Sequence, residues 1–348
     1  MAVLEDKSAR SALITEAMSL SAPMERPRLP RRFRKRDAIA LVVSNVIGVG
    51  IFTTPAVIAS LAPSPAAMLG IWIVGGILAL AGASCYARLA ALWPSAGGEY
   101  VYLSRAYGPM AGFLSGWTSL IAGFSGAVAT SAVAAVIFAG RYFPTLSSNH
   151  SLFSSNFLGL TFTISYRTLG AALLIGVFAA LHILSLGVGK RIQNALAVFL
   201  VGLLVVFLVR GFTAGHGTWL NYRAPHQPVA PVNFLLALIP VMFTYSGWNA
   251  AVYISEEIRA PRRSIRPILL IGTGIVVALY LALNALYLYA LTPAQIRGSL
   301  NVADAAAQTL FAGRSSLITP VLILGLIGAV SAMTIAGPRV DDYLLDEV

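Results

Sequence analysis

The chain has 348 residues, of which 57% are hydrophobic and only 11% are charged, and its formal net charge is +11. A soluble domain carries about 25% charged residues, so this composition excludes an ordinary soluble protein and indicates an integral membrane protein. The basic residues flank apolar runs instead of forming one patch, so we expect them to face lipid headgroups and not nucleic acid.

Eight apolar runs are each long enough for the roughly 20 helical residues that cross a bilayer. They lack the period-two alternation of barrel strands, so the sequence predicts an all-α integral membrane protein. The predicted spans are 38–62, 66–87, 108–138, 168–189, 191–211, 233–255, 267–291 and 315–337. Between the third and fourth spans, we expect a solvated outer loop rich in Ser and Asn, at about 141–167.

Residues 1–36 form a basic tail without a long apolar core, so we predict a retained tail and not a cleaved signal peptide. Most of the 24 Lys and Arg residues fall in segments on the same side of the membrane as this tail. Because Lys and Arg accumulate in short cytoplasmic loops, we predict a multi-pass protein of the plasma (inner) membrane with a cytoplasmic N-terminus. The single cysteine, Cys85, excludes an intramolecular disulfide.

The first span contains a candidate break near its centre. Gly48 and Gly50 lie two residues apart, and Pro55 follows them. The small-xxx-small packing motif requires two small residues on one helix face. Glycines two residues apart do not share a face, so they do not form this motif. Since glycine tolerates backbone conformations that other residues resist, the pattern favours an unwound segment.

The sixth span carries a second candidate break, where Pro240 precedes the run Phe243–Trp248 with Gly247. Interrupted helices at corresponding positions of two halves are typical of the binding site of a secondary transporter. Spans one and six are five apart, as an inverted repeat of five helices requires. Freed N–H groups can bind a carboxylate, and freed carbonyls can bind an ammonium group. The pair of breaks therefore predicts an amino acid site. Alternatively, these glycines only allow close packing or gentle kinks.

Several segments together carry a family resemblance. They are Val46–Phe52, Pro94–Tyr102, Ala106–Pro109, Phe243–Asn249, and Glu256–Arg259 with Pro261 and Arg263. In this order and spacing they resemble the first helix, the inner loop and third-helix start, and the sixth helix of the amino acid–polyamine–organocation (APC) superfamily of permeases. The resemblance covers about 37–339, and it is nearest to bacterial relatives of the L-type amino acid transporters.

The resemblance implies a LeuT-type inverted-repeat fold in which helices 1 and 6 are discontinuous and a mobile bundle rocks against a scaffold. It implies an amino acid permease, a symporter or antiporter, and not an enzyme. The substrate-binding residues that it implies are the main chain of Ile47, Gly48, Val49, Gly50 and Ile51, the aromatic gate Phe243, and Thr244, Tyr245, Ser246, Gly247 and Asn249. Because the side-chain pocket inferred in this way is small and uncharged, we expect a neutral amino acid.

We divide the chain into a cytoplasmic tail (1–36), a first repeat (37–212), an outer loop (213–232), an incomplete second repeat (233–337) and a cytoplasmic tail (338–348). The family has at least ten helices, so we expect a C-terminally truncated member, and a non-transporting permease is one alternative. Arg88 stands where the family usually has Glu. No lysine occurs around Val198–Leu200, where some relatives carry one for ion coupling. A coupling proton and an exchanged amino acid therefore both stay open.

Three ionisable residues near or within the spans have two interpretations each. Glu256 and Glu257 follow the sixth span and precede several arginines, so they form either an inner gate or a solvated charge cluster. His182, the only histidine inside a predicted span, is either a proton relay or a neutral packing residue.

Two other classes of membrane protein are alternatives to a carrier. A membrane-embedded enzyme needs converging acid–base or metal-binding groups, but the sequence has no HExxH motif and no His/Asp pair at ligand spacing. We therefore expect no metal and no cofactor. A channel or sensor stays an alternative, although a channel filter usually repeats its lining through oligomeric symmetry, whereas these breaks form a pair within one chain.

Overall fold

A computed structural model of the chain describes residues 29–147, 151–157, 160–223, 228–312 and 318–340. Most of the predicted basic tail, residues 1–28, and the acidic end, residues 341–348, lie outside the described residues. The chain divides into two units, 1–30 and 31–348, and the architecture below is that of the second unit.

Among the residues that the structure describes, six helices are long and apolar enough to cross a membrane. They are α4 (Pro65–Leu92); the continuous helix formed by α6 (Pro109–Thr118), η1 (Ser119–Gly126) and α7 (Ala127–Ala139); α9 (Tyr166–Leu184); α10 (Leu186–Ala214); α13 (Pro261–Ala290); and α16 (Ile318–Ala336). A seventh candidate is the pair α2 (Lys35–Val46) and α3 (Gly50–Leu61), which is bent by 44° at its break. The membrane-spanning part is therefore helical, and the predicted boundaries lie within a few residues of these helices.

The predicted sixth span, 233–255, is not one continuous helix. Its first part is α11 (Pro231–Tyr245), an apolar helix of 15 residues that is shorter than the candidate spans. A turn separates α11 from the four-residue α12 (Ala250–Tyr253) and the 3-10 turn η3 (Ser255–Glu257). The structure thus has six or seven candidate spans by length and composition, where the sequence predicted eight.

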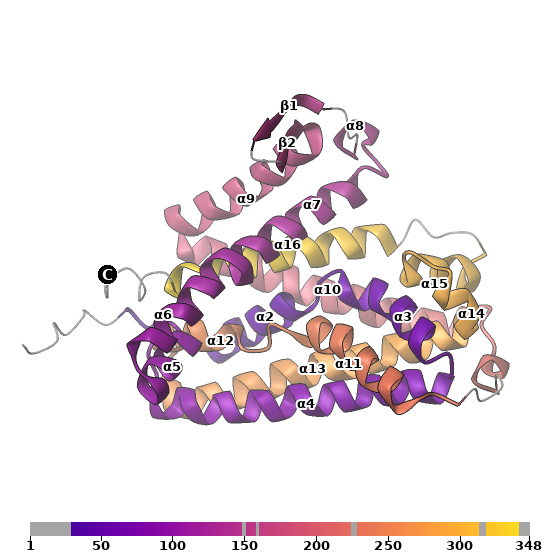
Figure 1. Cartoon of the computed structure of the whole chain (residues 1–348), viewed down its shortest axis with the longest axis horizontal. Coiled ribbons are helices and arrows are strands. Elements are labelled where there is room, and N and C mark those ends of the chain that lie inside the picture. The colour runs from indigo at the N-terminus through magenta and orange to yellow at the C-terminus, as the bar shows by residue number, and fades with distance from the viewer. Residues whose placement is uncertain (1–28, 148–150, 158–159, 224–227, 313–317, 341–348) are drawn as a thin grey trace, which may run out of the picture. The chain divides into compact units, whose positions relative to one another are not determined.

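Helices α4, α10, α11 and α16 pack around α2, α3 and α13, while α7 and α9 pack against α16 (Figure 1). The long α13 lies along α4, while α2 contacts α13, α10 and α16. Glycines on α4 allow close approach, because a Cβ added at Gly75 would lie 2.4 Å from Val241 and one at Gly76 would lie 2.8 Å from Val277. The centre of this core holds the buried rings of Trp72, Tyr245 and Tyr280.

The connections are more structured than the sequence predicted. The loop 141–167 holds the short α8 (Pro144–Ser147) and an antiparallel hairpin of β1 (Ser151–Phe157) and β2 (Leu160–Ser165). The hairpin is a departure from the all-α prediction, although it lies outside the candidate spans. The remaining short elements are α5 (Glu99–Tyr107), η2 (Trp219–Arg223), α14 (Pro293–Arg297) and α15 (Val302–Leu310).

Candidate functional site

The first span is broken at the predicted position. Helix α2 ends at Val46, Ile47 is extended (φ −76°, ψ 92°), and α3 begins again at Gly50. A helix leaves its first N–H groups and last carbonyls without partners inside the helix. The N-terminus of α3 therefore presents N–H groups and partial positive charge, while the C-terminus of α2 presents carbonyls and partial negative charge.

The second break follows α11 and depends on Gly247. Ser246 is extended, and Gly247 has a φ of +101°, in a region that L side chains rarely adopt. A Cβ added at Gly247 would also lie only 2.6 Å from the side-chain nitrogen of Asn45. Any other residue here would be strained by its backbone and would collide with α2. Glycine is thus required at this position for two independent reasons.

Hydrogen bonds hold the two breaks together. The Asn45 side chain donates from Nδ2 to the Gly247 carbonyl oxygen, at 3.0 Å. The buried Tyr280 hydroxyl, on α13, lies 2.9 Å from the Val46 carbonyl oxygen and 3.4 Å from that of Thr244. Tyr280 therefore reaches freed carbonyls at the ends of both α2 and α11. The two half-helix ends are fixed beside one another.

A third contact joins α3 to α11 just beyond the breaks. The hydroxyls of Thr54 and Thr244 lie 2.8 Å apart, and both side chains are buried. Gly50 faces the same threonine, because a Cβ added there would lie 2.7 Å from Thr244 Oγ1. A Cβ added at Gly48 would meet nothing within 4 Å. Gly50 is therefore needed for packing, whereas Gly48 borders open space.

The predicted substrate-binding residues separate into two groups. The side chains of Ile47, Ile51, Thr244 and Tyr245 are buried, and the Tyr245 hydroxyl donates to the Trp72 carbonyl. These four residues could offer a substrate only main-chain groups. The partly or largely exposed group is Gly48, Val49, Gly50, Phe243, Ser246, Gly247 and Asn249.

Within the exposed group, Phe243 has 80% of its side chain exposed beside the second break. The Ser246 hydroxyl donates to the Phe243 carbonyl oxygen at 2.7 Å, so it satisfies one of the freed carbonyls of α11. Asn249 lies one residue before α12, and its amide hydrogen-bonds to the Glu99 carboxylate and to the Tyr253 hydroxyl. The structure therefore links Asn249 to α5.

The predicted inner residues also form specific contacts. The Glu257 carboxylate is buried and pairs with Arg339 at 2.9 Å, and Arg339 also donates to the Ile335 carbonyl. The Glu256 carboxylate accepts a bond of 3.4 Å from the Ala96 N–H. Glu257 is thus part of a buried ion pair and not of a solvated cluster.

A set of contacts around Asp37, at the start of α2, was not singled out by sequence reasoning. The buried Asp37 carboxylate lies 3.3 Å from Lys190 Nζ and accepts a 2.7 Å bond from Asn194, both on α10. Lys190 Nζ also donates to the Arg32 carbonyl and lies over the Phe33 ring. The sequence signal that could have indicated these contacts is an acidic residue, Asp37, that directly follows a basic run at the start of an apolar span.

The backbone next to Asp37 is bound as well. Phe33 forms a bridge with Ile258, in which the Phe33 N–H donates to Glu257 O and the Arg259 N–H donates to Phe33 O. The segment that precedes α2 is therefore tied to the segment that follows η3. Both segments lie at the end of the bundle that carries the Asp37–Lys190 and Glu257–Arg339 pairs.

Two ionisable side chains outside the breaks, His182 and Tyr102, lie in buried surroundings. His182 is buried between α9 and α16, where Nε2 lies 3.1 Å from the Ser331 hydroxyl and the ring packs against Phe178. This contact favours the packing interpretation of His182 over a proton relay. On α5, burial and then the nearby Glu99 carboxylate raise the pKa of the Tyr102 hydroxyl, which therefore stays neutral.

The paired breaks offer complementary groups to a small dipolar molecule. The N–H groups and positive end of α3 suit a carboxylate, and the carbonyl ends of α2 and α11 suit an ammonium group. Within the described residues, no group of three or more His, Cys, Asp or Glu side chains could hold a metal ion.

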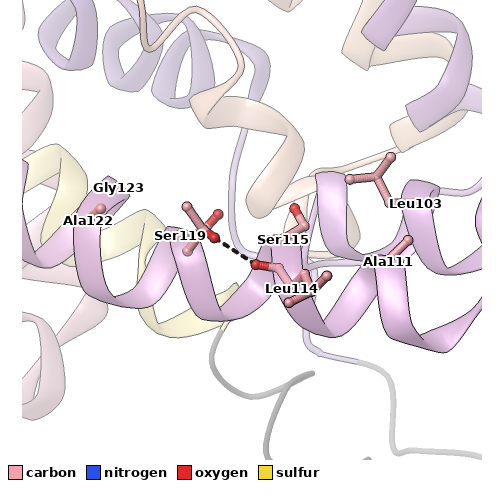
Figure 2. Close-up of a pocket in the computed structure, with 8 residues that line it drawn as sticks. Leu103, Ala111, Leu114, Ser115, Ser119, Ala122 and Gly123 are labelled. Carbon is pink, nitrogen blue, oxygen red and sulfur yellow. Dashed lines mark hydrogen bonds between the residues drawn. The ribbon is translucent and has the colours of Figure 1, made fainter.

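A shallow groove elsewhere does not include these groups. Figure 2 shows it along α6 and η1, which contribute Ala111, Leu114, Ser115, Thr118, Ser119, Ala122 and Gly123, while α5 contributes Leu103. The Thr118 hydroxyl donates to the Leu114 carbonyl at 2.8 Å, so this polar group is satisfied within its own helix. None of the predicted substrate-binding residues lies in this groove.

Known amino acid transporters are similar to most of this chain. The chain is 26% identical to the mouse b(0,+)-type amino acid transporter 1 over 341 residues, which cover 97% of the chain and 67% of that protein. It is 26% identical to the serine/threonine exchanger SteT of Bacillus subtilis over 310 residues, which cover 87% of the chain and 65% of SteT. The chain is 27% identical to the mouse large neutral amino acids transporter small subunit 2 over 318 residues, which cover 87% of the chain and 56% of that protein.

The chain thus spans between 56% and 67% of the length of these relatives. A family model described as amino acid permease matches residues 35–342, from the start of α2 to beyond α16. This match includes both breaks and every candidate span. The chain belongs to the amino acid permease family, a family of membrane transporters and not of enzymes.

Proposed function

We propose that this protein is a secondary active carrier that moves amino acids across the membrane by alternating access. The substrate's carboxylate would lie at the N-terminus of α3, and its ammonium group at the carbonyl ends of α2 and α11. The observation that carries this proposal is the pair of breaks joined by Asn45 and Tyr280. Gly48 adds open space beside the freed N–H groups.

We further propose a LeuT-type fold with an eighth, broken span made of α11 and α12. Helix α11 packs against α3, and α12 packs against α2. The chain therefore passes the two breaks in opposite directions, as an inverted repeat requires. On this basis residues 37–212 form the first repeat and 233–337 an incomplete second one, with the loop 213–232 between them and tails at 1–36 and 338–348.

A neutral amino acid is the proposed substrate, because the residues exposed at the breaks carry no ionised side chain. The names of two relatives fit this choice, since one is a serine/threonine exchanger and another a transporter of large neutral amino acids. Exchange of one amino acid for another is accordingly the proposed mode, with a coupling proton as the alternative. We also propose a cytoplasmic N-terminus, which the distribution of basic residues supports, and a location in the plasma (inner) membrane.

The inner gate is proposed to comprise Glu256, Glu257 and the groups around Asp37. Glu257 pairs with Arg339, and Asp37 pairs with Lys190. The Phe33–Ile258 bridge joins the two segments that carry these acids. These contacts close the inner end, and their release would let the inner half of the first span move.

Uptake into proteoliposomes tests the function. We expect labelled leucine or serine to enter vesicles loaded with unlabelled amino acid, with a rate that saturates as the concentration rises. Gly48→Ala should reduce uptake at least tenfold without destabilising the fold, because its methyl group enters the space proposed for the substrate. Gly202→Ala, where an added Cβ also meets nothing within 4 Å, is the matched control.

Three other results would separate the alternatives. Flux that rises linearly with concentration would indicate a channel. Saturable amino acid binding without any uptake would indicate that this chain, by itself, binds the substrate but does not transport it. Neither binding nor uptake in a folded, reconstituted sample would contradict the proposal itself.

A further inference from the structure

A cavity of about 590 Å³ lies at the end of the bundle opposite Lys35, away from both breaks. One face of α10 lines it with Leu203, Val206, Phe207, Arg210 and Ala214. The positions differ by three, four, seven and eleven residues from Leu203, so they share one side of the helix. The other walls are His216, just after α10, the end of α15 with Leu310, Phe311 and Ala312, and the start of α16 with Ile318 and Val321.

The lining changes from apolar to basic along α10. Phe207 and Val321 are buried, and Val206 is 57% exposed, so the apolar part opens to the outside of the bundle. Arg210 stands one turn before the end of α10, and His216 follows that end. From Arg210 back to Leu203 the helix covers about 10 Å. An apolar slot of this depth therefore lies beneath a basic rim, at the level where α10 leaves the membrane.

The basic groups of the rim are available to an outside partner. Arg210 and His216 are both exposed, and within the described ranges no carboxylate forms an ion pair with either of them. The one acidic residue on the neighbouring α15, Asp304, pairs instead with Arg141 at 3.1 Å. A basic rim that the protein leaves without an acid at a membrane boundary matches the phosphate of a lipid headgroup.

The rim is also held in place. The His216 N–H donates to the Leu310 carbonyl at 3.0 Å, and the Thr218 N–H donates to the Tyr289 carbonyl at 2.9 Å. A Cβ added at Gly215 would lie 2.3 Å from the Gly211 carbonyl oxygen, so this turn allows no larger residue. The segment that carries His216 is thus fixed against α13 and α15 before any ligand arrives, which lowers the entropic cost of binding.

We propose that this cavity binds one phospholipid, with its phosphate at Arg210 and His216 and an acyl chain in the slot along α10. The polarity of the slot runs from basic to apolar along α10, as a lipid's own polarity runs from headgroup to chain. This site is distinct from the amino acid site and does not depend on the proposed transport function.

Native mass spectrometry of the delipidated full chain in detergent tests the site. The probes are dioleoyl phosphatidylglycerol, dioleoylglycerol, which lacks the phosphate, and inorganic phosphate. The wild-type protein should bind one phosphatidylglycerol at least tenfold more tightly than dioleoylglycerol, and inorganic phosphate should not displace it. Arg210→Gln should weaken phosphatidylglycerol binding about tenfold, because a charge-assisted bond is lost.

Matched variants separate this site from general lipid contact. Arg223→Gln removes the same charge from an exposed position in η2 outside the cavity, and should bind phosphatidylglycerol as the wild type does. Val206→Trp should block binding by filling the slot. Equal loss in Arg210→Gln and Arg223→Gln, or equal binding of dioleoylglycerol and phosphatidylglycerol, would overturn the proposal. Displacement of phosphatidylglycerol by inorganic phosphate would do the same, since it would indicate a free-anion site.

Discussion

At the scale of single residues, Tyr280 is the side chain on which the paired breaks depend most. Tyr280→Phe removes the hydroxyl that lies 2.9 Å from Val46 O and leaves that buried carbonyl without its partner. Loss of a buried hydrogen bond costs about 1–3 kcal/mol when one group is left unsatisfied. We expect the variant to lower the unfolding temperature and to reduce uptake, and thermal unfolding with the proteoliposome assay would measure both.

Tyr287 provides the control for this prediction. It lies on the same helix, its side chain is fully buried, and its hydroxyl has no hydrogen-bond partner among the described residues. Tyr287→Phe should therefore leave stability unchanged or raise it slightly, and leave uptake unchanged. Equal effects of the two substitutions would show that Tyr280 acts only through the bulk of its ring.

The two glycines of the first break should behave differently. Gly50→Ala places a methyl group 2.7 Å from Thr244 Oγ1, so it should separate the Thr54–Thr244 contact and cost about 1–3 kcal/mol of stability. Gly48→Ala meets no protein atom within 4 Å and should leave stability unchanged. Denaturation of the purified variants would test the difference. Equal destabilisation would argue that both glycines serve only packing.

At the scale of helices, the inner half of the first span should open as a unit. Asp37→Asn removes the ion pair of Asp37 with Lys190, whose side chain is 21% exposed. Because Lys190 is partly exposed, we expect a loss of about 1–3 kcal/mol, below the 3–5 kcal/mol of a fully buried pair. Hydrogen exchange should rise about tenfold or more in Lys35–Val46 and change little in α3.

A pair at the other end of the bundle serves as the comparison. Asp304→Asn breaks the more exposed pair with Arg141 and should leave exchange in α2 unchanged. If Asp37→Asn raised exchange equally in α2 and α3, the first span would behave as one continuous helix. That result would contradict an independent inner half.

The long helices could be predicted because an apolar run of fixed length is a strong signal by itself. The breaks could also be predicted, since Gly48 and Gly50 are two residues apart, a spacing that does not put them on one helix face, and Gly247 follows Pro240 near the middle of the sixth span. The β-hairpin was missed, although Leu160, Phe162 and Ile164 alternate with polar residues as a half-exposed strand does. That signal was hidden by the Ser and Asn residues around it.

The partners of the breaks could not be found from the sequence. Asn45 lies three residues before Gly48, but its bond to Gly247 spans 202 residues. Tyr280 lies inside an apolar span and shows no local pattern that points to Val46. Pairings of this kind follow from how α2, α11 and α13 pack, so they appear only when the helices are assembled.

At the scale of the whole molecule, one architecture carries both proposed sites. The breaks in α2–α3 and α11–α12 present main-chain groups in the middle of the bundle. The cavity along α10 presents a basic rim and an apolar slot at one end. The proposed inner gate, with the pairs of Asp37 with Lys190 and of Glu257 with Arg339, lies at the opposite end. A carrier needs a central site and an end that can open, and the family membership agrees with this arrangement.

The central claim is that freed main-chain groups at the paired breaks bind an amino acid. Amide spectra of the full chain labelled with ¹⁵N-glycine, titrated with leucine, test it most directly, with Gly48→Ala and Gly202→Ala assigning signals. We predict that the amide signals of Gly48, Gly50 and Gly247 shift saturably, while that of Gly202 stays in place. Saturable shifts confined to other glycines, or no shift at any concentration, would contradict the account.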